Sequence, residues 1–441
     1  MKKVILFFGR PDPYRDYWWP PINLLFLAAS LVSNGYRVKI VDEQITPHYK
    51  AELVKAARGA VLVGFTCYTG HQIKGNLKAA RLLKKRFPKL PLVWGGSHPS
   101  ALPEQTIKSR FVDVVVRGQG ELALLELAEA FRLERGLGSV KGIVFKEGKA
   151  THSIPAREYY DINLIPQLPM YLIDWRKYLN PRTRILNYTS SWGCTNWCTF
   201  CYWTGKHFWS GFPAFRVIND LTYLQANGAK TIRMLDSDFF TDKPRALAIA
   251  QGILRSGLKL EWFVNTRLSS AMQYSRKDWL LFHKVGLRSV FIGLESGSSE
   301  LLRAMNKNIE LEDMLALSRR LNIIPIKIYL SLMFGLPGET MKDLQATSDF
   351  YKQIVAINAM VWRQICIFEP LPGTPLAAIA QKHGFKFPKT LKGWAALGYK
   401  SEGFKGRPWF TKEFNKEYKK KLYELFPNSD NYLTQVSRQK K

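Results

Sequence analysis

Hydrophobic runs alternate with amphipathic stretches over the first 150 residues of the chain. Short apolar runs such as "KVILFF" and "AVLVGF" have the length of buried strands, whereas "PPINLLFLAASLVSNG" and "QIKGNLKAARLLKKRFP" repeat their apolar positions with a helical period. Strands that alternate with helices predict a parallel, doubly wound sheet. Residues 1–150 are therefore predicted to form one α/β domain with a Rossmann-like arrangement.

The same alternation returns after a stretch without periodicity. Residues 151–185 carry four prolines and predict a linker. Residues 186–376 contain six strand-like runs separated by helix-like stretches, which predicts a partial (β/α)6 barrel with its chemistry at the carboxyl ends of the strands. Residues 377–441 are expected to form a tail of short helices rich in Lys, Trp and Phe.

Composition narrows the class of protein. Hydrophobic residues make up 46% of the 441 residues, which is enough for real cores and excludes global disorder. The sequence contains no apolar run of the ~18 residues that a membrane-spanning helix needs. The short apolar run at the start of the sequence is more typical of a buried strand than of a signal peptide. With only five cysteines, we expect a cytoplasmic protein that uses thiols for metal binding rather than for disulfides.

The chain is strongly basic, with 65 Lys and Arg against 35 Asp and Glu. Such an excess favours an anionic partner, although a solvated basic surface without a specific partner has the same composition. The basic residues form no uninterrupted block of the kind that nucleic-acid-binding arms carry, so a nucleic-acid partner is not expected.

Three of the five cysteines lie within "GCTNWCTFCYW", at Cys194, Cys198 and Cys201. A structural zinc site would need a fourth ligand, for which His207, Cys67 or Cys366 are available, but the spacing is not that of a zinc finger. A redox pair is a weaker alternative because the first gap is not C-x-x-C. An iron–sulfur cluster with three protein ligands would leave one iron open to another ligand.

The C-x3-C-x2-C spacing directly after the first strand of a predicted barrel resembles the radical S-adenosylmethionine superfamily. The resemblance implies that the three cysteines hold a [4Fe–4S] cluster whose open iron binds S-adenosylmethionine. It implies further contacts to S-adenosylmethionine from the segments "TFC", "MLDSDFF", "VNTR", "GLESG" and "FGLPGE", although the common G-G-E form is absent from the second of these. The residues implied are Phe200, Asp236, Ser237, Asp238, Arg267, Glu295, Ser296, Gly335 and Gly338.

The first domain resembles the cobalamin-binding domain that precedes the barrel in many of these enzymes. Glycines and polar residues collect directly after its strands, in "GFTCYTGHQ", "WGGSHPS" and "VRGQGE", and ligands of doubly wound sheets bind at such strand ends. The D-x-H-x-x-G motif is absent, which implies a cobalamin without a histidine from that motif on cobalt; His71 is a weaker candidate for that role. The residues implied are Trp18, Trp19, Thr66, Tyr68, Thr69, His71, Gln72, Gly95, Gly96, Ser97, His98, Gly118, Gln119, Gly120 and Glu121.

The resemblance implies a C-methyltransferase that acts on an unactivated sp3 carbon by way of a 5′-deoxyadenosyl radical and methylcobalamin. The alternatives are a cobalamin-dependent radical cyclase or rearrangement enzyme and, from another class, a non-catalytic basic binder of nucleic acid or of a membrane surface with a structural cluster. A methylthiotransferase is disfavoured because residues 1–150 contain only Cys67. No catalytic side chain beyond the cofactor ligands is identified from the sequence.

The partners expected are a small-molecule or lipid-like substrate with anionic groups, an external low-potential electron donor, and peripheral rather than transmembrane contact with a membrane. The segment "KHFWSGF" and the tail aromatic residues offer apolar and basic surface for such a substrate; the tail residues are Trp394, Phe404, Trp409 and Phe410. Of the aromatic residues among the cysteines, Trp197, Tyr202 and Trp203 are expected to shield the cluster from solvent.

Overall fold

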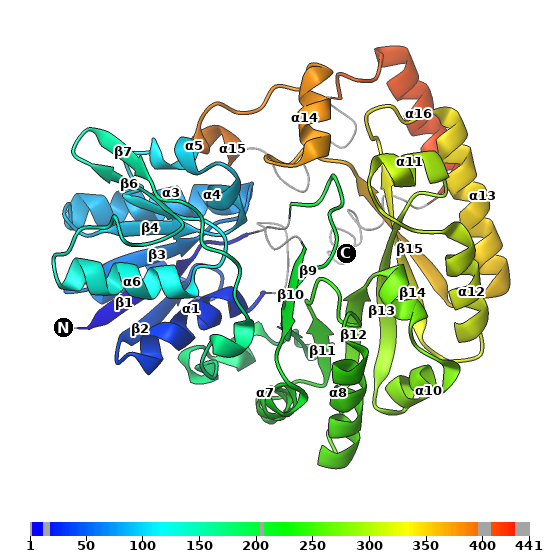
Figure 1. Ribbon diagram of the computed structural model, residues 1–441, viewed down its shortest axis with the longest axis horizontal. Coiled ribbons are helices and arrows are strands. Elements are labelled where there is room, and N and C mark those ends of the chain that lie inside the picture. Colours follow the sequence, from blue (N-terminus) through cyan, green and yellow to red (C-terminus); the bar gives the residue numbers. More distant parts are fainter. Residues whose placement is uncertain (1, 12–17, 203–206, 396–406, 428–441) are drawn as a thin grey trace. The chain divides into compact units, whose positions relative to one another are not determined.

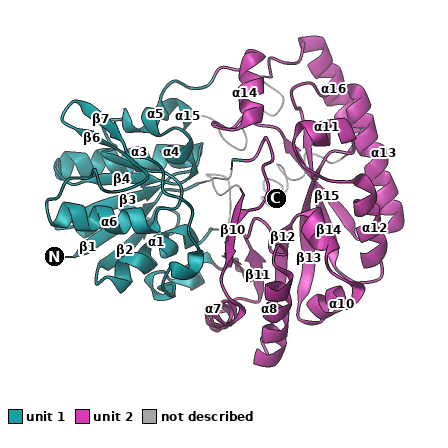
Figure 2. Cartoon of the chain, in the orientation of Figure 1, with its two compact units in different colours: residues 1–178, 202–205, 387–401 teal, residues 179–201, 206–386, 402–441 magenta. Residues whose placement is uncertain are grey.

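The computed structural model describes residues 2–11, 18–202, 207–395 and 407–427, which fall into two compact units. Unit 1 comprises residues 1–178, 202–205 and 387–401, and unit 2 comprises the rest (Figure 2). Two expectations, for Trp203 and for Phe404, concern residues outside the described part of the chain.

Unit 1 is built on a seven-stranded sheet with the order β2-β1-β3-β4-β5-β6-β7 (Figure 1). Its first five strands are parallel, and β6 and β7 add to the β5 edge as antiparallel strands. The strands are β1 (Lys3–Phe8), β2 (Arg37–Asp42), β3 (Leu62–Thr66), β4 (Leu92–Gly95), β5 (Val114–Val116), β6 (Ile143–Glu147) and β7 (Ala150–Ser153). The helices are α1 (Ile22–Ser33), α2 (Tyr49–Ala57), α3 (His71–Arg86), α4 (Ser97–Ala101), α5 (Pro103–Ile107), α6 (Glu121–Arg132) and α15 (Leu391–Trp394).

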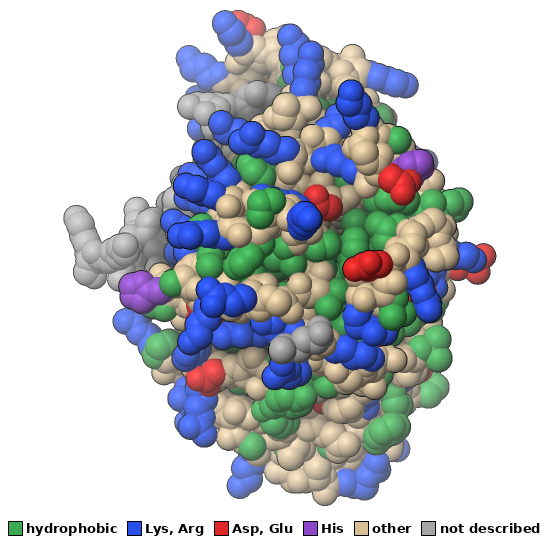
Figure 3. Space-filling view, turned by 90° about the vertical axis from the view of Figure 1, so that its left-hand side faces the viewer, with side chains coloured by type: hydrophobic (Ala, Val, Ile, Leu, Met, Phe, Trp, Pro, Cys, Tyr) green, Lys and Arg blue, Asp and Glu red, His purple; other side chains and the backbone are tan. Residues whose placement is uncertain are grey.

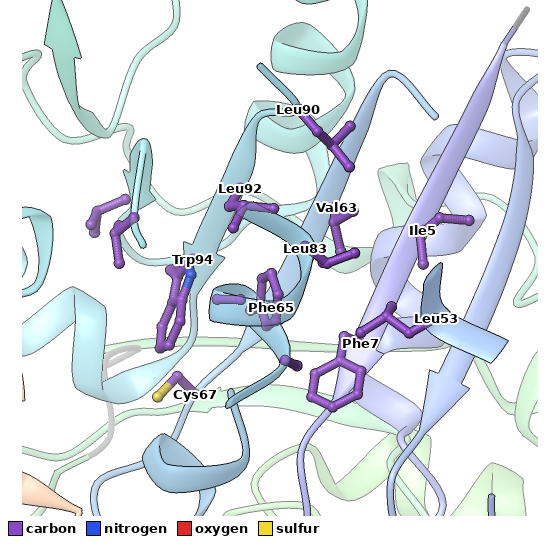
Figure 4. Packing of buried hydrophobic residues seen from close by; sticks show 14 of the residues in the cluster. Ile5, Phe7, Leu53, Val63, Phe65, Cys67, Leu83, Leu90, Leu92 and Trp94 are labelled. Atoms are coloured by element: carbon purple, nitrogen blue, oxygen red, sulfur yellow. The ribbon is translucent and has the colours of Figure 1, made fainter. Parts of the chain in front are cut away.

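Both faces of the unit 1 sheet are buried, as its apolar strands require. Successive residues of β1 point to opposite faces, so Ile5 and Phe7 join a core with α2 and α3, whereas Leu6 joins a core with α1 and α6. Figure 4 shows the first of these cores, in which the rings of Phe65 and Trp94 stack with their centroids 5.2 Å apart. The prediction of a doubly wound domain is confirmed.

Unit 2 contains a sheet of six parallel strands in the order β15-β14-β13-β12-β11-β8. The strands are β8 (Ile185–Tyr188), β11 (Thr231–Met234), β12 (Glu261–Thr266), β13 (Leu287–Glu295), β14 (Lys327–Phe334) and β15 (Val361–Ile367). The helices are α7 (Ala214–Ala226), α8 (Lys243–Ser256), α9 (Leu268–Met272), α10 (Arg276–Lys284), α11 (Ser299–Ala304), α12 (Leu311–Leu321), α13 (Met341–Ile357), α14 (Pro375–Lys382) and α16 (Lys412–Leu425). The six predicted β/α units are present, and the strand order is that of an open, partial barrel.

A short hairpin that the sequence analysis did not predict follows β8. Strand β9 (Ser191–Cys194) pairs antiparallel with β10 (Phe208–Gly211), so the first cysteine of the triplet ends a strand. Residues 208–211, expected as substrate-facing surface, are therefore half of the hairpin. Trp209 pairs with Gly193, and the backbone of Phe208 pairs with that of Cys194.

Residues of the predicted linker and tail make contacts within the two units. Residues of the linker pack into unit 1, where Tyr178 donates a hydrogen bond to Asp42 (2.8 Å) and Tyr160 donates one to Glu121 (2.6 Å). The tail divides between the units, because Trp394 is buried in the core of unit 1 and α16 belongs to unit 2. Trp394 therefore packs in a core rather than forming substrate surface.

The basic residues are dispersed. Figure 3 shows Lys and Arg side chains spread over one face of the molecule among few acidic ones, without a single continuous block. None of the helices in the described part of the chain is long and apolar enough to cross a membrane.

Candidate functional site

The cysteine triplet lies on the loop that begins at the end of β9. Gly193 precedes Cys194 with φ +92°, and a Cβ atom there would lie 1.9 Å from the Phe208 carbonyl oxygen, so only glycine fits the hairpin. The backbone N–H of Cys201 donates to the carbonyl of Cys198 (3.1 Å), which closes a turn between the last two cysteines. All five cysteines of the chain are thiols rather than disulfide partners.

The three thiols of the cysteine loop are soft ligands of the kind that iron–sulfur clusters use. Within the described residues, no group of three or more His, Cys, Asp or Glu side chains is placed to hold one ion. An iron–sulfur cluster binds each thiolate to a different iron, so its ligands lie farther apart than those of a single ion. Burial raises the pKa of Cys194, the charge of Arg267 acts to lower it, and the nearby Cys201 adds to the rise. Metal ligation stabilises the thiolate under such conditions.

Arg267 brings a cation to the cysteine loop from the carboxyl end of β12. Its Nη1 donates to the Sγ of Cys198 (3.4 Å), and its Nη2 donates to the carbonyl oxygen of Lys307 (2.8 Å). Its Nε is buried without a hydrogen-bond partner among the described residues. The side chain is therefore fixed in place with its Nε–H still available, next to the thiol of a cluster cysteine.

Asp236 and Asp238 lie in the loop that follows β11, and both are fully buried. Asp236 accepts hydrogen bonds from the backbone N–H (2.7 Å) and the hydroxyl (2.5 Å) of Ser190, which connects it to the start of β9. Asp238 accepts from the hydroxyls of Thr266 (2.9 Å) and Ser270 (2.6 Å), while burial raises its pKa. Both carboxylates thus hold neighbouring strand ends in place, and the predicted contact of this segment with S-adenosylmethionine stays a prediction, as it does for the half-buried Ser237 between them.

Glu295 ends β13 at a bulge in the pairing with β14 and has φ +71°, a conformation that costs a residue with a Cβ atom. Its Oε1 accepts from the Lys307 ammonium at 2.8 Å, and both side chains are less than a tenth exposed. Its Oε2 is buried without a partner among the described residues. The neighbouring Ser296 forms a 3.1 Å hydrogen bond with the hydroxyl of Thr347, on α13.

The loop after β14 is closed on itself by a side chain that the sequence analysis did not select. Gly335 and Leu336 donate their backbone N–H groups to Glu339 Oε2 at 2.6 and 2.9 Å. Both Gly335 and Gly338 have positive φ, so this loop needs glycine at those positions. Burial raises the pKa of Glu339 to about 7.

The strand ends of unit 1 carry a second group of predicted residues. The hydroxyl of Thr66 accepts a hydrogen bond from Asn23 (2.6 Å), while the side chain of Gln72 accepts from the N–H of Tyr68 (2.8 Å) and donates to the carbonyl oxygen of Gly9 (2.9 Å). These bonds join the ends of β1 and β3, between which the strand order of the sheet reverses. Ligands of doubly wound sheets bind at such a reversal.

The end of β4 lies beside that of β3. The hydroxyl of Thr69 lies 2.9 Å from Nδ1 of His98 and 2.7 Å from the hydroxyl of Tyr202. His98 is completely buried, its pKa is lowered by burial to about 4, and its Nε2 lacks a partner among the described residues. Gly96 has φ +98°, and a Cβ atom there would lie 2.8 Å from the carbonyl oxygen of Cys67. Gly95 and Ser97 flank it at the same strand end.

The end of β5 is tied to the segment after the sheet. Gly118 donates its N–H to Ser100 (3.0 Å), and Gln119 exchanges two hydrogen bonds with the backbone of Tyr160 (2.8 and 3.0 Å). Gly120 caps α6 and Glu121 is its first residue. The pKa of Glu121 is raised by burial.

The remaining residues predicted to bind cobalamin are Trp18, Trp19 and His71. Trp19 exchanges hydrogen bonds with Gln44, after β2, and Trp18 lies under the guanidinium of Arg10 at 4.6 Å. They are thus placed at the β1–β2 ends, where a cavity of about 520 Å3 is lined by Arg10, Trp18, Gln44 and neighbours. His71 is the first residue of α3, partly exposed.

Two matches to protein families cover most of the chain. Residues 15–128 match the model described as "B12 binding domain", and residues 188–351 match the model of the "Radical SAM superfamily". An uncharacterized methyltransferase of Pyrococcus horikoshii is 30% identical over 367 residues, which cover 81% of this chain and 77% of that protein. The chain belongs to the cobalamin-binding radical S-adenosylmethionine enzymes.

More distant relatives differ in the reaction that their names give. An anaerobic magnesium-protoporphyrin IX monomethyl ester cyclase of Rubrivivax gelatinosus is 26% identical over 75% of this chain, and a hopanoid C-3 methylase of Methylococcus capsulatus is 24% identical over 66%. The aligned regions cover 61% and 56% of those two longer proteins. Among solved structures, the radical S-adenosylmethionine methyltransferase TsrM of Kitasatospora setae matches with a TM-score of 0.75 at 17% identity, over 98% of this chain and 90% of that one.

The family and the fold class predicted from the sequence are confirmed, and so is the prediction of an enzyme. The roles of the individual site residues stay predictions. Two residues that the structure places among the predicted site residues, Lys307 and Glu339, were not predicted from the sequence. Glu339 stands inside the quoted "FGLPGE", where an acidic residue four positions after a glycine could have suggested a loop clamp; Lys307 had no such signal.

Proposed function

We propose that the chain is a cobalamin-dependent radical S-adenosylmethionine methyltransferase that transfers a methyl group to an unactivated sp3 carbon of a small molecule. The observation that carries the proposal is the cysteine triplet at the carboxyl edge of six parallel strands, with the guanidinium of Arg267 on Cys198, in a chain whose first domain matches the B12-binding model. The methyltransferase assignment is supported by the relative from Pyrococcus horikoshii.

The residues of unit 2 fit a [4Fe–4S] cluster with S-adenosylmethionine beside it. The three thiols lie on one loop, which supplies the soft ligands that such a cluster requires. The unused Nε of Arg267 and the unused Oε2 of Glu295 are, respectively, a donor suited to a carboxylate and an acceptor suited to a hydroxyl. Both are buried, and a buried polar atom without a partner costs folding free energy unless a ligand satisfies it.

The residues of unit 1 fit cobalamin at the ends of β3, β4 and β5. Gly96 adds no side chain to the strand ends, and the hydroxyl of Thr69 makes them polar. The pKa of His98 is lowered by burial to about 4, so this side chain is neutral near pH 7. A neutral, buried imidazole would add no charge to the strand ends that would hold cobalamin. We include the remaining predicted strand-end residues in the same site.

When bound, the cluster supplies the electron that cleaves S-adenosylmethionine, and the cobalamin carries the methyl group. The protein itself would bind and orient the ligand: Arg267 and Glu295 would hold S-adenosylmethionine, and Gly335 would let the backbone come close to it. Burial of these groups excludes water from the site, which protects reactive species and strengthens each polar contact. The proposal includes an external low-potential electron donor and a substrate that bears anionic groups, in keeping with the net charge of +30.

The test is anaerobic reconstitution of the cluster in the full chain with cobalamin, followed by incubation with S-adenosylmethionine and a low-potential reductant. Formation of 5′-deoxyadenosine supports a radical enzyme, and its absence with an intact cluster would favour the non-catalytic binder. With an extract of candidate small molecules, a product heavier by one methyl group supports the methyltransferase.

A cyclase or rearrangement enzyme is the second candidate, and the similarity to the Rubrivivax gelatinosus cyclase favours it. The same incubation separates the two. A product that has lost hydrogen or kept its mass, with no methyl gained from labelled S-adenosylmethionine, would overturn the methyltransferase in favour of this alternative.

A further inference from the structure

Lys307 lies where three of the predicted S-adenosylmethionine residues meet. Its ammonium pairs with Glu295 at 2.8 Å and lies 5.6 Å from the ring centroid of Phe200. Its carbonyl oxygen accepts the hydrogen bond from Nη2 of Arg267 at 2.8 Å. One residue therefore contacts side chains from the cysteine loop, from the end of β12 and from the end of β13.

The turn that carries Lys307 also holds the cysteine loop. The backbone N–H of Thr199 donates to the carbonyl of Met305 (2.9 Å), and the side chain of Asn306 donates to the carbonyl of Trp197 (2.8 Å). Asn306 has φ +50°, a left-handed conformation that asparagine tolerates better than most residues. Residues 304–307 thus fix the loop between Cys194 and Cys201 against the strand ends.

The ion pair between Lys307 and Glu295 leaves hydrogen-bonding capacity unused on both side chains. A lysine ammonium has three N–H donors, and among the described residues the structure gives it one hydrogen-bond acceptor, Glu295 Oε1. The second oxygen of Glu295 is buried and finds no hydrogen-bond partner in the part of the chain that the structure describes. Because burying two charges is costly unless further hydrogen bonds satisfy them, an ion pair with unused hydrogen-bonding capacity indicates a ligand.

The backbone at Glu295 supports the same conclusion. This residue holds φ +71° at a bulge of β13, where a glycine would be less strained. Strained backbone persists where surrounding contacts fix it, and it is concentrated at ligand-binding positions. Lys307 is the cation that holds the carboxylate of this strained residue in one orientation.

We propose that Lys307 is a positioning residue for S-adenosylmethionine, which acts by holding Glu295 so that its free oxygen accepts a hydrogen bond from the ligand, and by joining that contact to the cysteine loop. The inference rests on the proposed function in so far as the ligand of unit 2 is S-adenosylmethionine. It adds a residue outside the strand-end motifs and a physical link between the cluster loop and the ligand contact.

The test compares Lys307→Met and Lys307→Arg with wild type in the full, anaerobically reconstituted chain. The matched control is Lys352→Met, which removes the exposed lysine of an ion pair with Asp349. Three quantities are measured: iron and sulfide content, the Kd of S-adenosylmethionine by equilibrium dialysis, and the change that S-adenosylmethionine causes in the electron paramagnetic resonance spectrum of the reduced cluster.

Lys307→Met is expected to keep its iron and sulfide but to bind S-adenosylmethionine about tenfold more weakly, with a smaller spectral change, whereas Lys307→Arg recovers part of the affinity and the control matches wild type. A Lys307→Met variant with the wild-type Kd and spectral change would overturn the inference and leave a purely structural ion pair. Where Lys307→Met does not assemble the cluster, the same measurements on Lys307→Gln, which keeps a hydrogen-bond donor, decide in the same way.

Failure of the inference is distinct from failure of the proposed function. A wild-type enzyme that binds S-adenosylmethionine but methylates nothing contradicts the proposed function, and a weaker Kd in Lys307→Met would still support the positioning role. A wild-type Kd in Lys307→Met contradicts the inference alone.

Discussion

The guanidinium of Arg267 donates a hydrogen bond to the thiol of Cys198, with 3.4 Å between Nη1 and Sγ. This contact places a permanent positive charge at the cluster ligand, because an arginine stays protonated at all relevant pH values. Hydrogen bonds and charges at the cysteine sulfurs are among the features that set the reduction potential of an iron–sulfur cluster. Arg267 therefore acts on the cluster as well as on the ligand beside it.

Replacement of Arg267 by glutamine is expected to lower the midpoint potential of the cluster. The loss of a positive charge near the sulfur makes reduction less favourable, by on the order of 100 mV at an effective dielectric constant of about 20. A redox titration followed by electron paramagnetic resonance measures the shift. Arg288→Gln, which removes a guanidinium from the exposed pair with Glu261, is the control. Equal potentials in wild type and Arg267→Gln would show that the contact does not influence the cluster.

Gly193→Ala is expected to abolish cluster assembly. Its Cβ atom would lie 1.9 Å from the Phe208 carbonyl oxygen, so the β9–β10 hairpin that positions Cys194 has to open. Gly257→Ala is a matched control, because that residue also has a positive φ but nothing within 4 Å of its Cβ position. The control carries only the backbone strain of about 1–2 kcal/mol. Iron content after reconstitution is the measurement, and a Gly193→Ala variant with the iron content of the control would refute the steric argument.

Much of this architecture could be predicted from the sequence, because both units are built from periodic elements. The run "KVILFF" has every residue but the first buried, on alternating faces of the sheet, as a strand of a two-sided core requires. The cysteine spacing and the strand-end motifs identified the family because they lie within contiguous stretches of sequence. Patterns within one contiguous stretch of sequence can be recognised without knowledge of the fold.

The parts that could not be predicted depend on contacts between distant residues. Phe208–Gly211 contains no run of β-branched residues that would predict a strand, and its pairing with β9 makes it one. Lys307 lies 12 residues from Glu295 in another element of the chain, and the ion pair exists because the turn after α11 lies at the end of β13. Trp394 is an ordinary tail aromatic in sequence, yet its Nε1 donates to Gln105 in unit 1.

Glu339 is expected to make the stability of unit 2 depend on pH. Burial raises its pKa from 4.5 to about 7, so the folded state favours the protonated form. The contribution of protonated Glu339 to the free energy of unfolding is fully present below about pH 4.5 and is lost as the pH rises through about 7. The shift of about 2.5 pKa units corresponds to roughly 3 kcal/mol. Glu339→Gln keeps an oxygen for the N–H groups of Gly335 and Leu336 but cannot ionise.

The wild type should therefore lose stability relative to Glu339→Gln between pH 5 and pH 8, which thermal melting of both proteins at the two pH values measures. Comparison with the variant removes the contribution of other buried groups that titrate in this range, such as Asp42, whose pKa is raised by burial to about 6. Parallel melting temperatures across the range would exclude Glu339 as the titrating group.

The neighbouring glycines at the end of β4 give a test of the cobalamin site in unit 1. Gly96 has φ +98°, and an added Cβ atom would lie 2.8 Å from the carbonyl oxygen and 2.9 Å from the nitrogen of Cys67. Gly95 has only ordinary van der Waals neighbours at 3.8 Å, on Val116. Gly96→Ala must therefore move the backbone that joins the ends of β3 and β4, whereas Gly95→Ala is accommodated by the protein.

We expect Gly96→Ala to lower the melting temperature and to purify with less than half of the wild-type cobalamin, since strained backbone at one such position costs about 1–3 kcal/mol. Gly95→Ala should melt like the wild type. The cobalamin content of Gly95→Ala is measured from the absorbance of the anaerobically purified protein. Because this variant keeps its stability, a loss of cobalamin would mean that the ligand contacts the strand end directly at Gly95. Full cobalamin content and wild-type melting in Gly96→Ala would contradict both the steric argument and the placement of cobalamin at this strand end.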